Sequence, residues 1–226
     1  MKVLVMSVHP DDETLGCGGT LLKHKMEGDE IFWLIATDMK VKDGFSKEKI
    51  AARDKEIETV SLKYNFRKTV RLGFPASKLD KMPVADLVDK ISRVFNMIKP
   101  EIIYLPFRHD IHSDHRVFFE AAYSCTKSFR QSSIKRILMM EVISETEFAP
   151  ALKARIFVPN HFVDITETIK NKIDIMKIYK SELKKHPFPR SIKNIRALAT
   201  FRGAAIGAKY AEAFMVLKQV WPLEEK

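Results

Sequence analysis

The sequence has 226 residues, is 46% hydrophobic and carries a formal net charge of +10. This length and apolar content exclude a mainly disordered chain, and we expect one domain over residues 1–226. No apolar run approaches the roughly 18 residues that a membrane span requires, and the first residues do not resemble a secretory leader, so we expect a cytoplasmic protein.

The first half of the chain alternates between apolar strands and helices. We predict strands at residues 3–8, 31–37, 69–72 and 102–105. We predict helices at residues 14–27, 46–64 and 84–98. The nearly continuous apolar run at 3–8 is typical of a strand that is buried on both faces of a parallel sheet.

The second half of the chain is less regular. We predict strands at residues 136–144 and within 157–163, and helices from about residue 114, at 169–183 and at 191–210. Two prolines make residues 186–190 irregular, and residues 213–220 are expected to close the sheet as an edge strand. The repeated β-α-β order predicts a three-layer α/β fold with a mostly parallel sheet.

Two polar clusters directly follow predicted strands. Residues 9–13, His-Pro-Asp-Asp-Glu, come after the first strand, and residues 109–115, His-Asp-Ile-His-Ser-Asp-His, come after the fourth. Ligands bind beyond the carboxyl ends of the strands in such sheets. If the two strands are neighbours, four histidines and five acidic residues converge at one edge of the sheet.

These side chains are the ones that a catalytic zinc site uses. Such a site takes three protein ligands and leaves one position open, where bound water loses its proton more easily and a carbonyl can be polarised. His9 and Asp12 lie three residues apart on a turn, so both can reach one ion, and a ligand from the distant loop completes the set. Fe(II), Mn(II) or Co(II) would also accept nitrogen and oxygen ligands.

The neighbouring residues offer the other groups that amide hydrolysis needs. Asp11 stands next to the ligands and could act as the general base. His112 could stabilise the tetrahedral oxyanion and protonate the leaving amine, and Asp114 could orient an imidazole.

Both clusters also resemble the motifs of a known family. Residues 9–20, HPDDETLGCGGT, are similar to the signature of the PIG-L (LmbE-like) de-N-acetylases, and residues 112–115, HSDH, resemble their second motif. Residues 202–203 and 210–214 are similar to the closing segment of the family. Ser113 stands where many members have proline, which changes the stiffness of the loop and not the ligands.

The resemblance implies a Rossmann-like α/β fold and one zinc ion per chain. It implies metal ligands at His9, Asp12 and His115, a general base at Asp11, an acid or oxyanion-stabilising group at His112 and its partner at Asp114. The implied reaction is the hydrolysis of the N-acetyl group of an N-acetylglucosamine-type amino sugar, in a glycoconjugate or linked to a nucleotide. Arg53, three residues before Glu56, resembles a substrate-contacting arginine of the family.

The segment from Lys170 to Arg202 is strongly basic, with ten Lys and Arg residues against two acidic ones. One hypothesis is that Arg190 and Arg196 bind the amino-sugar substrate, including a phosphate on it. The alternatives for this segment are a solvated surface or a contact between subunits of a homo-oligomer.

Three other functions use parts of the same pattern. A metallohydrolase of another amide or of a phosphoester would need the same ligands. The net charge of +10 suggests a nucleic-acid-binding module, but no zinc-finger spacing or interleaving of aromatic and basic residues supports it, so we expect no nucleic-acid partner. A nucleotide-binding α/β protein without catalysis is the third alternative.

Overall fold

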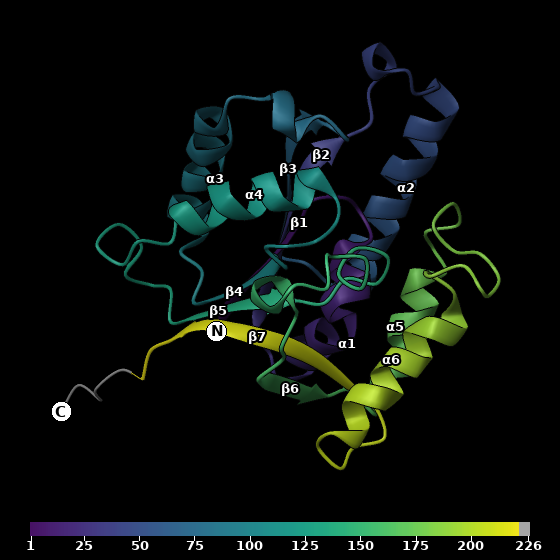
Figure 1. Cartoon of the computed structure of the whole chain (residues 1–226). Helices are drawn as coiled ribbons and strands as arrows, with labels where there is room; N and C mark the ends of the chain where they lie inside the picture. Colours follow the sequence, from purple (N-terminus) through teal and green to yellow (C-terminus); the bar gives the residue numbers. More distant parts are fainter. Residues whose placement is uncertain (222–226) are drawn as a thin grey trace.

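The computed structural model of the chain describes residues 1–221 and contains one sheet. Its strands are β1 (Lys2–Ser7), β2 (Glu30–Asp38), β3 (Lys68–Pro75), β4 (Ile102–Pro106), β5 (Arg136–Met140), β6 (His161–Asp164) and β7 (Ala211–Gln219). They lie in the order β3-β2-β1-β4-β5-β7-β6 (Figure 1). Strands β1 to β5 are parallel, and β7 is antiparallel to both of its neighbours.

Helices cover both faces of the sheet. They are α1 (Asp12–Met26), α2 (Lys47–Tyr64), α3 (Val84–Ile98), α4 (Ser113–Ser124), α5 (Ile169–Met176) and α6 (Ile192–Ala204), with short 3-10 turns η1 (Val41–Asp43), η2 (Leu79–Lys81) and η3 (Lys153–Arg155). Helices α3 and α4 pack on one face, and α1, α2, α5 and α6 pack on the other (Figure 1). The predicted three-layer, Rossmann-like α/β/α fold with a mostly parallel sheet is confirmed.

Strand β1 lies in the middle of both hydrophobic cores. Val3 and Val5 belong to the core under α1, whereas Leu4 and Met6 belong to the core under α3 and α4. All four side chains are fully buried. A central parallel strand therefore needs apolar residues on both faces, which explains the unbroken apolar run in the sequence.

The strand predicted at residues 213–220 is present as β7, but its predicted place at the edge of the sheet is wrong. Strand β7 lies between β5 and β6, and the four-residue β6 forms the edge of the sheet. Phe214 is paired with Met140 of β5 on one side and with His161 of β6 on the other. The local pattern of a strand indicates which face is buried but does not encode which strand pairs with it.

Three elements end earlier than predicted. Strand β5 ends at Met140, because the Val142 N–H donates to the Thr146 hydroxyl (3.0 Å) and Ser144 has a positive φ of 78°. Helix α5 ends at Met176 and α6 at Ala204. Tyr179 is fully buried although it lies beyond α5, so the apolar pattern continues past the end of the helix. Residues 186–190 are irregular, as predicted.

Helix α1 is interrupted at Cys17, where φ is −147° and ψ is 22°. Two buried side chains bind the backbone groups that the break frees. The Lys172 ammonium donates to the Leu15 carbonyl (2.9 Å), and the Glu212 carboxylate accepts from the N–H groups of residues 19–20 (2.8 and 2.7 Å). Lys172 and Glu212 also form an ion pair at 2.7 Å, so this pair from α5 and β7 completes α1.

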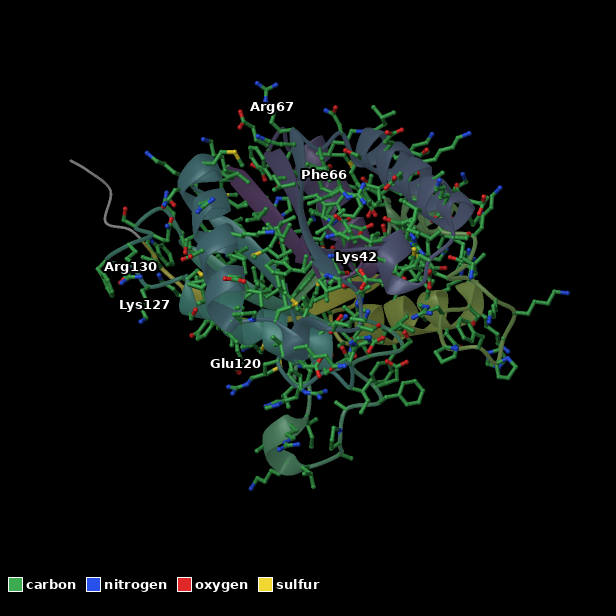
Figure 2. The ribbon with its side chains drawn as sticks, turned by 90° about the horizontal axis from the view of Figure 1, so that it is seen from above. Lys42, Phe66, Arg67, Glu120, Lys127 and Arg130 are labelled. Atoms are coloured by element: carbon green, nitrogen blue, oxygen red, sulfur yellow. The ribbon has the colours of Figure 1, made fainter. Side chains whose placement is uncertain are left out.

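The surface carries much of the basic character of the chain. Arg67, Lys127 and Arg130 are exposed and project outward from the edges of the molecule (Figure 2). Among residues 1–221, no helix combines the length and the apolar character that crossing a bilayer requires.

Candidate active site

The two polar clusters meet at one edge of the sheet. Strands β1 and β4 are hydrogen-bonded neighbours, and α1 and α4 begin shortly after them. The imidazole rings of His9, His112 and His115 lie with their centroids 4.8 to 5.8 Å apart. The two motifs therefore lie side by side, as expected if their strands are neighbours.

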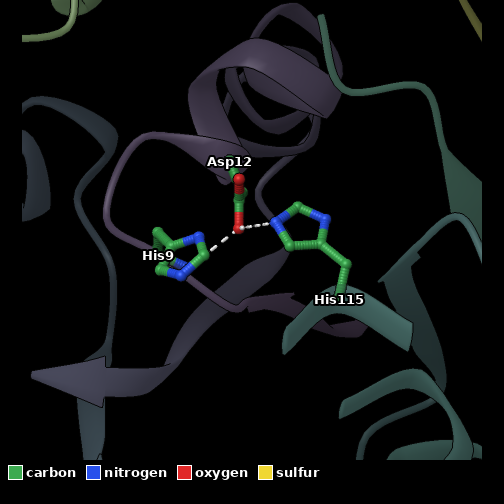
Figure 3. A group of neighbouring side chains, drawn as sticks. All are labelled: His9, Asp12 and His115. Atoms are coloured by element: carbon green, nitrogen blue, oxygen red, sulfur yellow. Dashed lines mark hydrogen bonds and ion pairs between the residues drawn. The ribbon is translucent and has the colours of Figure 1, made fainter. Parts of the chain in front are cut away.

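Two groups within this cluster have the composition of a metal site, His9-Asp12-His115 and His9-His112-Asp114, and the first is the more buried of the two. Ligand atoms of His9, Asp12 and His115 all lie within 4.8 Å of one another. The Asp12 carboxylate lies between the two histidines (Figure 3), and its Oδ2 is 3.5 Å from the His115 Nε2. That same oxygen accepts the backbone N–H groups of Val8 and His9 at 2.8 and 2.9 Å, which hold the carboxylate in place.

The His115 ring leaves one nitrogen for a ligand. Its Nδ1 is bonded to the Asp110 carboxylate at 2.8 Å, whereas its buried Nε2 has no hydrogen-bond partner within the described part of the chain. A buried nitrogen without a hydrogen-bond partner lowers the stability of the fold unless a ligand binds it. The residues present therefore fit a divalent cation held by two nitrogens and one oxygen.

Asp110 supports His115 from behind. It is fully buried, and its second oxygen accepts the Thr146 hydroxyl at 2.7 Å. Burial lowers the pKa of His115, but Asp12 and Asp110 outweigh burial and raise that pKa to about 9. The sequence pattern suggested no separate role for Asp110; its position five residues before His115, a candidate ligand, was the available signal.

Asp11 lies next to Asp12 in an unusual backbone conformation. Its φ of 133° is rarely adopted by residues with a side chain, and its N–H donates to the buried Glu13 carboxylate (3.1 Å). Burial, followed by the charges of Asp12 and Glu182, raises the pKa of Asp11 well above its usual value. Backbone strain of this kind persists only where the surroundings impose it, and it concentrates at functional sites.

His112 lines the cavity and has one ring nitrogen fixed by a hydrogen bond. It is the N-cap of α4, and its Nδ1 accepts the Asp114 backbone N–H at 3.1 Å. The neutral ring therefore carries its proton on Nε2. Partial burial, followed by the neighbouring His9 and His115, lowers the pKa of His112, which favours this neutral form.

The resemblance implied that Asp114 is the partner of His112, but the Asp114 carboxylate does not contact the His112 ring. Its Oδ2 lies 3.3 Å from the His9 Nε2 and accepts a hydrogen bond from the Ser77 N–H (2.6 Å). Its Oδ1 accepts a hydrogen bond from the Leu79 N–H (3.0 Å). Asp114 therefore orients the imidazole of His9 and fastens the turn after β3. It reaches His112 only through its backbone N–H.

A cavity of about 320 Å³ opens beside these residues. Arg53 and Arg190 both line it, and both are paired with Glu182. Arg53 also donates to the Pro10 carbonyl at 3.1 Å. Arg196 is exposed on α6 and does not line the cavity, so the structure does not bring it to the other candidate residues.

Other parts of the cavity wall differ from the expectation. His109 packs edge-on against Phe107 at the border of a separate surface pocket, so three of the four histidines converge. Sequence reasoning gave no role to Asp38, Asp54, Arg71, Glu145 and Glu182, all of which line the cavity. They come from segments without a recognisable motif, and only the fold brings them here.

Comparison with known proteins agrees with this geometry. The PIG-L family model, described as GlcNAc-PI de-N-acetylase, matches residues 4–126. The diacetylchitobiose deacetylase of Thermococcus kodakarensis is 27% identical over 223 residues, which cover 93% of this chain and 81% of that protein. A probable N-acetyl-alpha-D-glucosaminyl L-malate deacetylase 2 of Bacillus cereus is 27% identical over 128 residues, covering 53% of this chain and 58% of that protein.

A solved structure has the same fold over almost the whole chain. The N,N'-diacetylchitobiose deacetylase of Pyrococcus horikoshii, solved with its inhibitor MPG, superposes with a TM-score of 0.77 at 20% identity and covers 99% of this chain and 88% of that one. Since the family match spans more than half of the sequence and includes both motifs, the chain belongs to the PIG-L family and is an enzyme of the hydrolytic N-deacetylase class.

Proposed function

We propose that the chain hydrolyses the acetamido group of an N-acetylglucosamine-type amino sugar with the help of one zinc ion. The observation that carries this proposal is the buried Nε2 of His115, which lies next to Asp12 and His9 and has no hydrogen-bond partner within residues 1–221. Asp12 and His9 line a cavity together with Asp11 and His112. The family description and the names of the relatives support the acetamido group as the target.

His9, Asp12 and His115 would hold the ion. When bound there, zinc supplies a Lewis acid that polarises the amide carbonyl and makes water more acidic. Two imidazoles and a carboxylate are a ligand set that catalytic zinc sites use. Asp110 and Asp114 hold the rings of His115 and His9 in the required orientation.

Asp11 and His112 carry out the proton transfer and charge stabilisation. The Asp11 carboxylate takes a proton from the attacking water and returns it to the departing amine as the C–N bond breaks, which yields acetate and a free amino group. The His112 Nε2–H donates a hydrogen bond to the oxygen that becomes negative in the tetrahedral state. The bond from the Asp114 N–H keeps the proton on that nitrogen.

Acetate release from N-acetylglucosamine derivatives tests this function. The purified protein is analysed for metal, stripped with a chelator, reloaded with zinc, iron, manganese or cobalt, and offered free, lipid-linked and nucleotide-linked sugars. We expect about one metal per chain and acetate release that chelation stops and zinc restores. Full activity after exhaustive chelation would exclude the metal mechanism, and phosphate release without acetate would favour a phosphoester hydrolase.

Asp110→Asn is expected to weaken metal binding about 10- to 100-fold, because a neutral amide holds the His115 ring less firmly and makes it less basic. The measurement is competition with a chromogenic chelator. Thr146→Val is the graded control, since it removes only the hydroxyl behind Asp110 and should have a smaller effect. An unchanged metal affinity in Asp110→Asn would mean that this contact does not support the ligand.

A further inference from the structure

A second group of charged residues lies on the wall of the same cavity, away from the metal ligands. The Arg71 guanidinium on β3 binds Asp38 at the end of β2 through two nitrogens, at 2.7 and 2.6 Å, and binds Asp54 on α2 at 2.7 Å. We call these three residues the Asp–Arg–Asp cluster. All of them line the cavity, and the second oxygen of each carboxylate has no hydrogen-bond donor within residues 1–221.

The sheet builds this cluster through an irregularity. The register between β2 and β3 shifts after Ile35, and Gly73 has a positive φ of 75° at this point. The Lys40 ammonium donates to the Gly73 carbonyl and secures the bend. A bulge of this kind re-aims the side chains next to it. Asp38 ends β2, whereas Arg71 lies in the middle of β3 just before the bend, and both side chains line the cavity near the carboxyl ends of these strands.

The cavity wall has more acidic than basic side chains, although the chain as a whole has a positive net charge. Six carboxylates line the cavity, against three arginines: Asp11, Asp12, Asp38, Asp54, Glu145 and Glu182 against Arg53, Arg71 and Arg190. The chain as a whole has a net charge of +10, and many of its basic side chains point away from the molecule, as Arg67, Lys127 and Arg130 do (Figure 2).

Each guanidinium in the cavity is already matched by carboxylates. Arg71 faces two of them, and Arg53 and Arg190 share Glu182, while Arg53 also contacts Glu56 at 3.4 Å. A phosphate entering the cavity would have to displace these carboxylates or lie beside them. Like charges brought together in this way disfavour the binding of a phosphate. The basic segment of the sequence therefore does not provide a free phosphate site here.

We propose that the Asp–Arg–Asp cluster selects an uncharged or amine-bearing sugar and rejects a phosphorylated one. This inference rests on the proposed deacetylase function and names its substrate class. The free carboxylate oxygens accept hydrogen bonds from sugar hydroxyls or an ammonium group, and the Arg71 guanidinium donates them. Met39, Phe45 and Ile50 line the same cavity and offer apolar contact to the faces of the ring.

The test compares N-acetylglucosamine with its 6-phosphate on the zinc-loaded enzyme, by kcat/KM for acetate release. We expect the neutral sugar to be preferred at least about tenfold. In Asp54→Asn, which removes one charge and keeps the shape, that preference should fall about three- to fivefold. Glu58→Gln is the matched control, because Glu58 is exposed on the same helix and does not line the cavity.

The outcomes separate this inference from the proposed function. Acetate release from both sugars with equal or better use of the phosphate overturns the inference and leaves the function standing. If Asp54→Asn and Glu58→Gln lower the preference for the neutral sugar equally, the inference is also overturned, because the effect would then come from the overall charge. No acetate from any sugar overturns the proposed function; the inference is then judged by calorimetry, where the neutral sugar must bind the protein more tightly than its phosphate.

Discussion

Asp11→Asn is expected to lower kcat about 10²- to 10⁴-fold while the protein keeps its metal. An amide cannot take a proton from water, but it has the same shape as the carboxylate, and Asp11 is not one of the three residues that fit the ion. The measurements are the rate of acetate release at saturating substrate and the metal content per chain.

Asp12→Asn is the companion variant, and we expect it to lose metal as well as activity, because Asp12 provides the oxygen between the two imidazoles. The metal-free Asp11→Asn protein should be at least as stable as the wild type. Burial raises the pKa of Asp11, so the charged carboxylate is disfavoured in the folded state and a neutral amide avoids that cost. A kcat within a few-fold of wild type would rule out Asp11 as the base.

Lys172→Met is expected to lower the free energy of unfolding by about 3–5 kcal/mol, because it leaves the buried Glu212 carboxylate without its cation. It also removes the donor to the Leu15 carbonyl at the break in α1. The measurement is urea denaturation of the metal-free protein, with the midpoint and slope compared between variants.

Lys170→Met is the matched control on the same helix. Lys170 pairs with Asp174 at 3.0 Å, but both side chains are largely exposed, so we expect little change in the denaturation midpoint. Glu212→Gln should lower stability as Lys172→Met does, because it leaves the ammonium buried and weakens the cap on residues 19–20. Equal midpoints for Lys170→Met and Lys172→Met would show that the buried pair does not stabilise α1.

The candidate metal site was accessible to sequence reasoning because its residues lie in two short motifs. The spacing of His9 and Asp12 places both on the turn between β1 and α1, and the second motif supplies His115 from the start of α4. Strand and helix periodicity predicted the alternation that makes β1 and β4 parallel. Both signals are local, so a single sequence can carry them.

The substrate side of the cavity was less predictable. Arg53 and Arg190 reach it, whereas Arg196, six residues beyond Arg190, points into solvent from α6. Where a helix begins and which of its faces points to the cavity determine which of these arginines reaches the substrate side. The boundaries of helices are the part of the structure that a sequence pattern predicts least well. Asp38 and Arg71 meet beside a shift in the register of β2 and β3, which no pattern in the sequence marks.

The sequence by itself determined the α/β alternation, the residue types of the candidate metal site and the positions of Asp11 and His112 beside it, since each depends on residues close together along the chain. The tertiary structure alone decided that β7 lies inside the sheet, that Asp114 orients His9, and that Lys172 and Glu212 complete α1. These are contacts between segments far apart in the sequence, and their partners depend on how strands pair and helices pack, which no local pattern specifies.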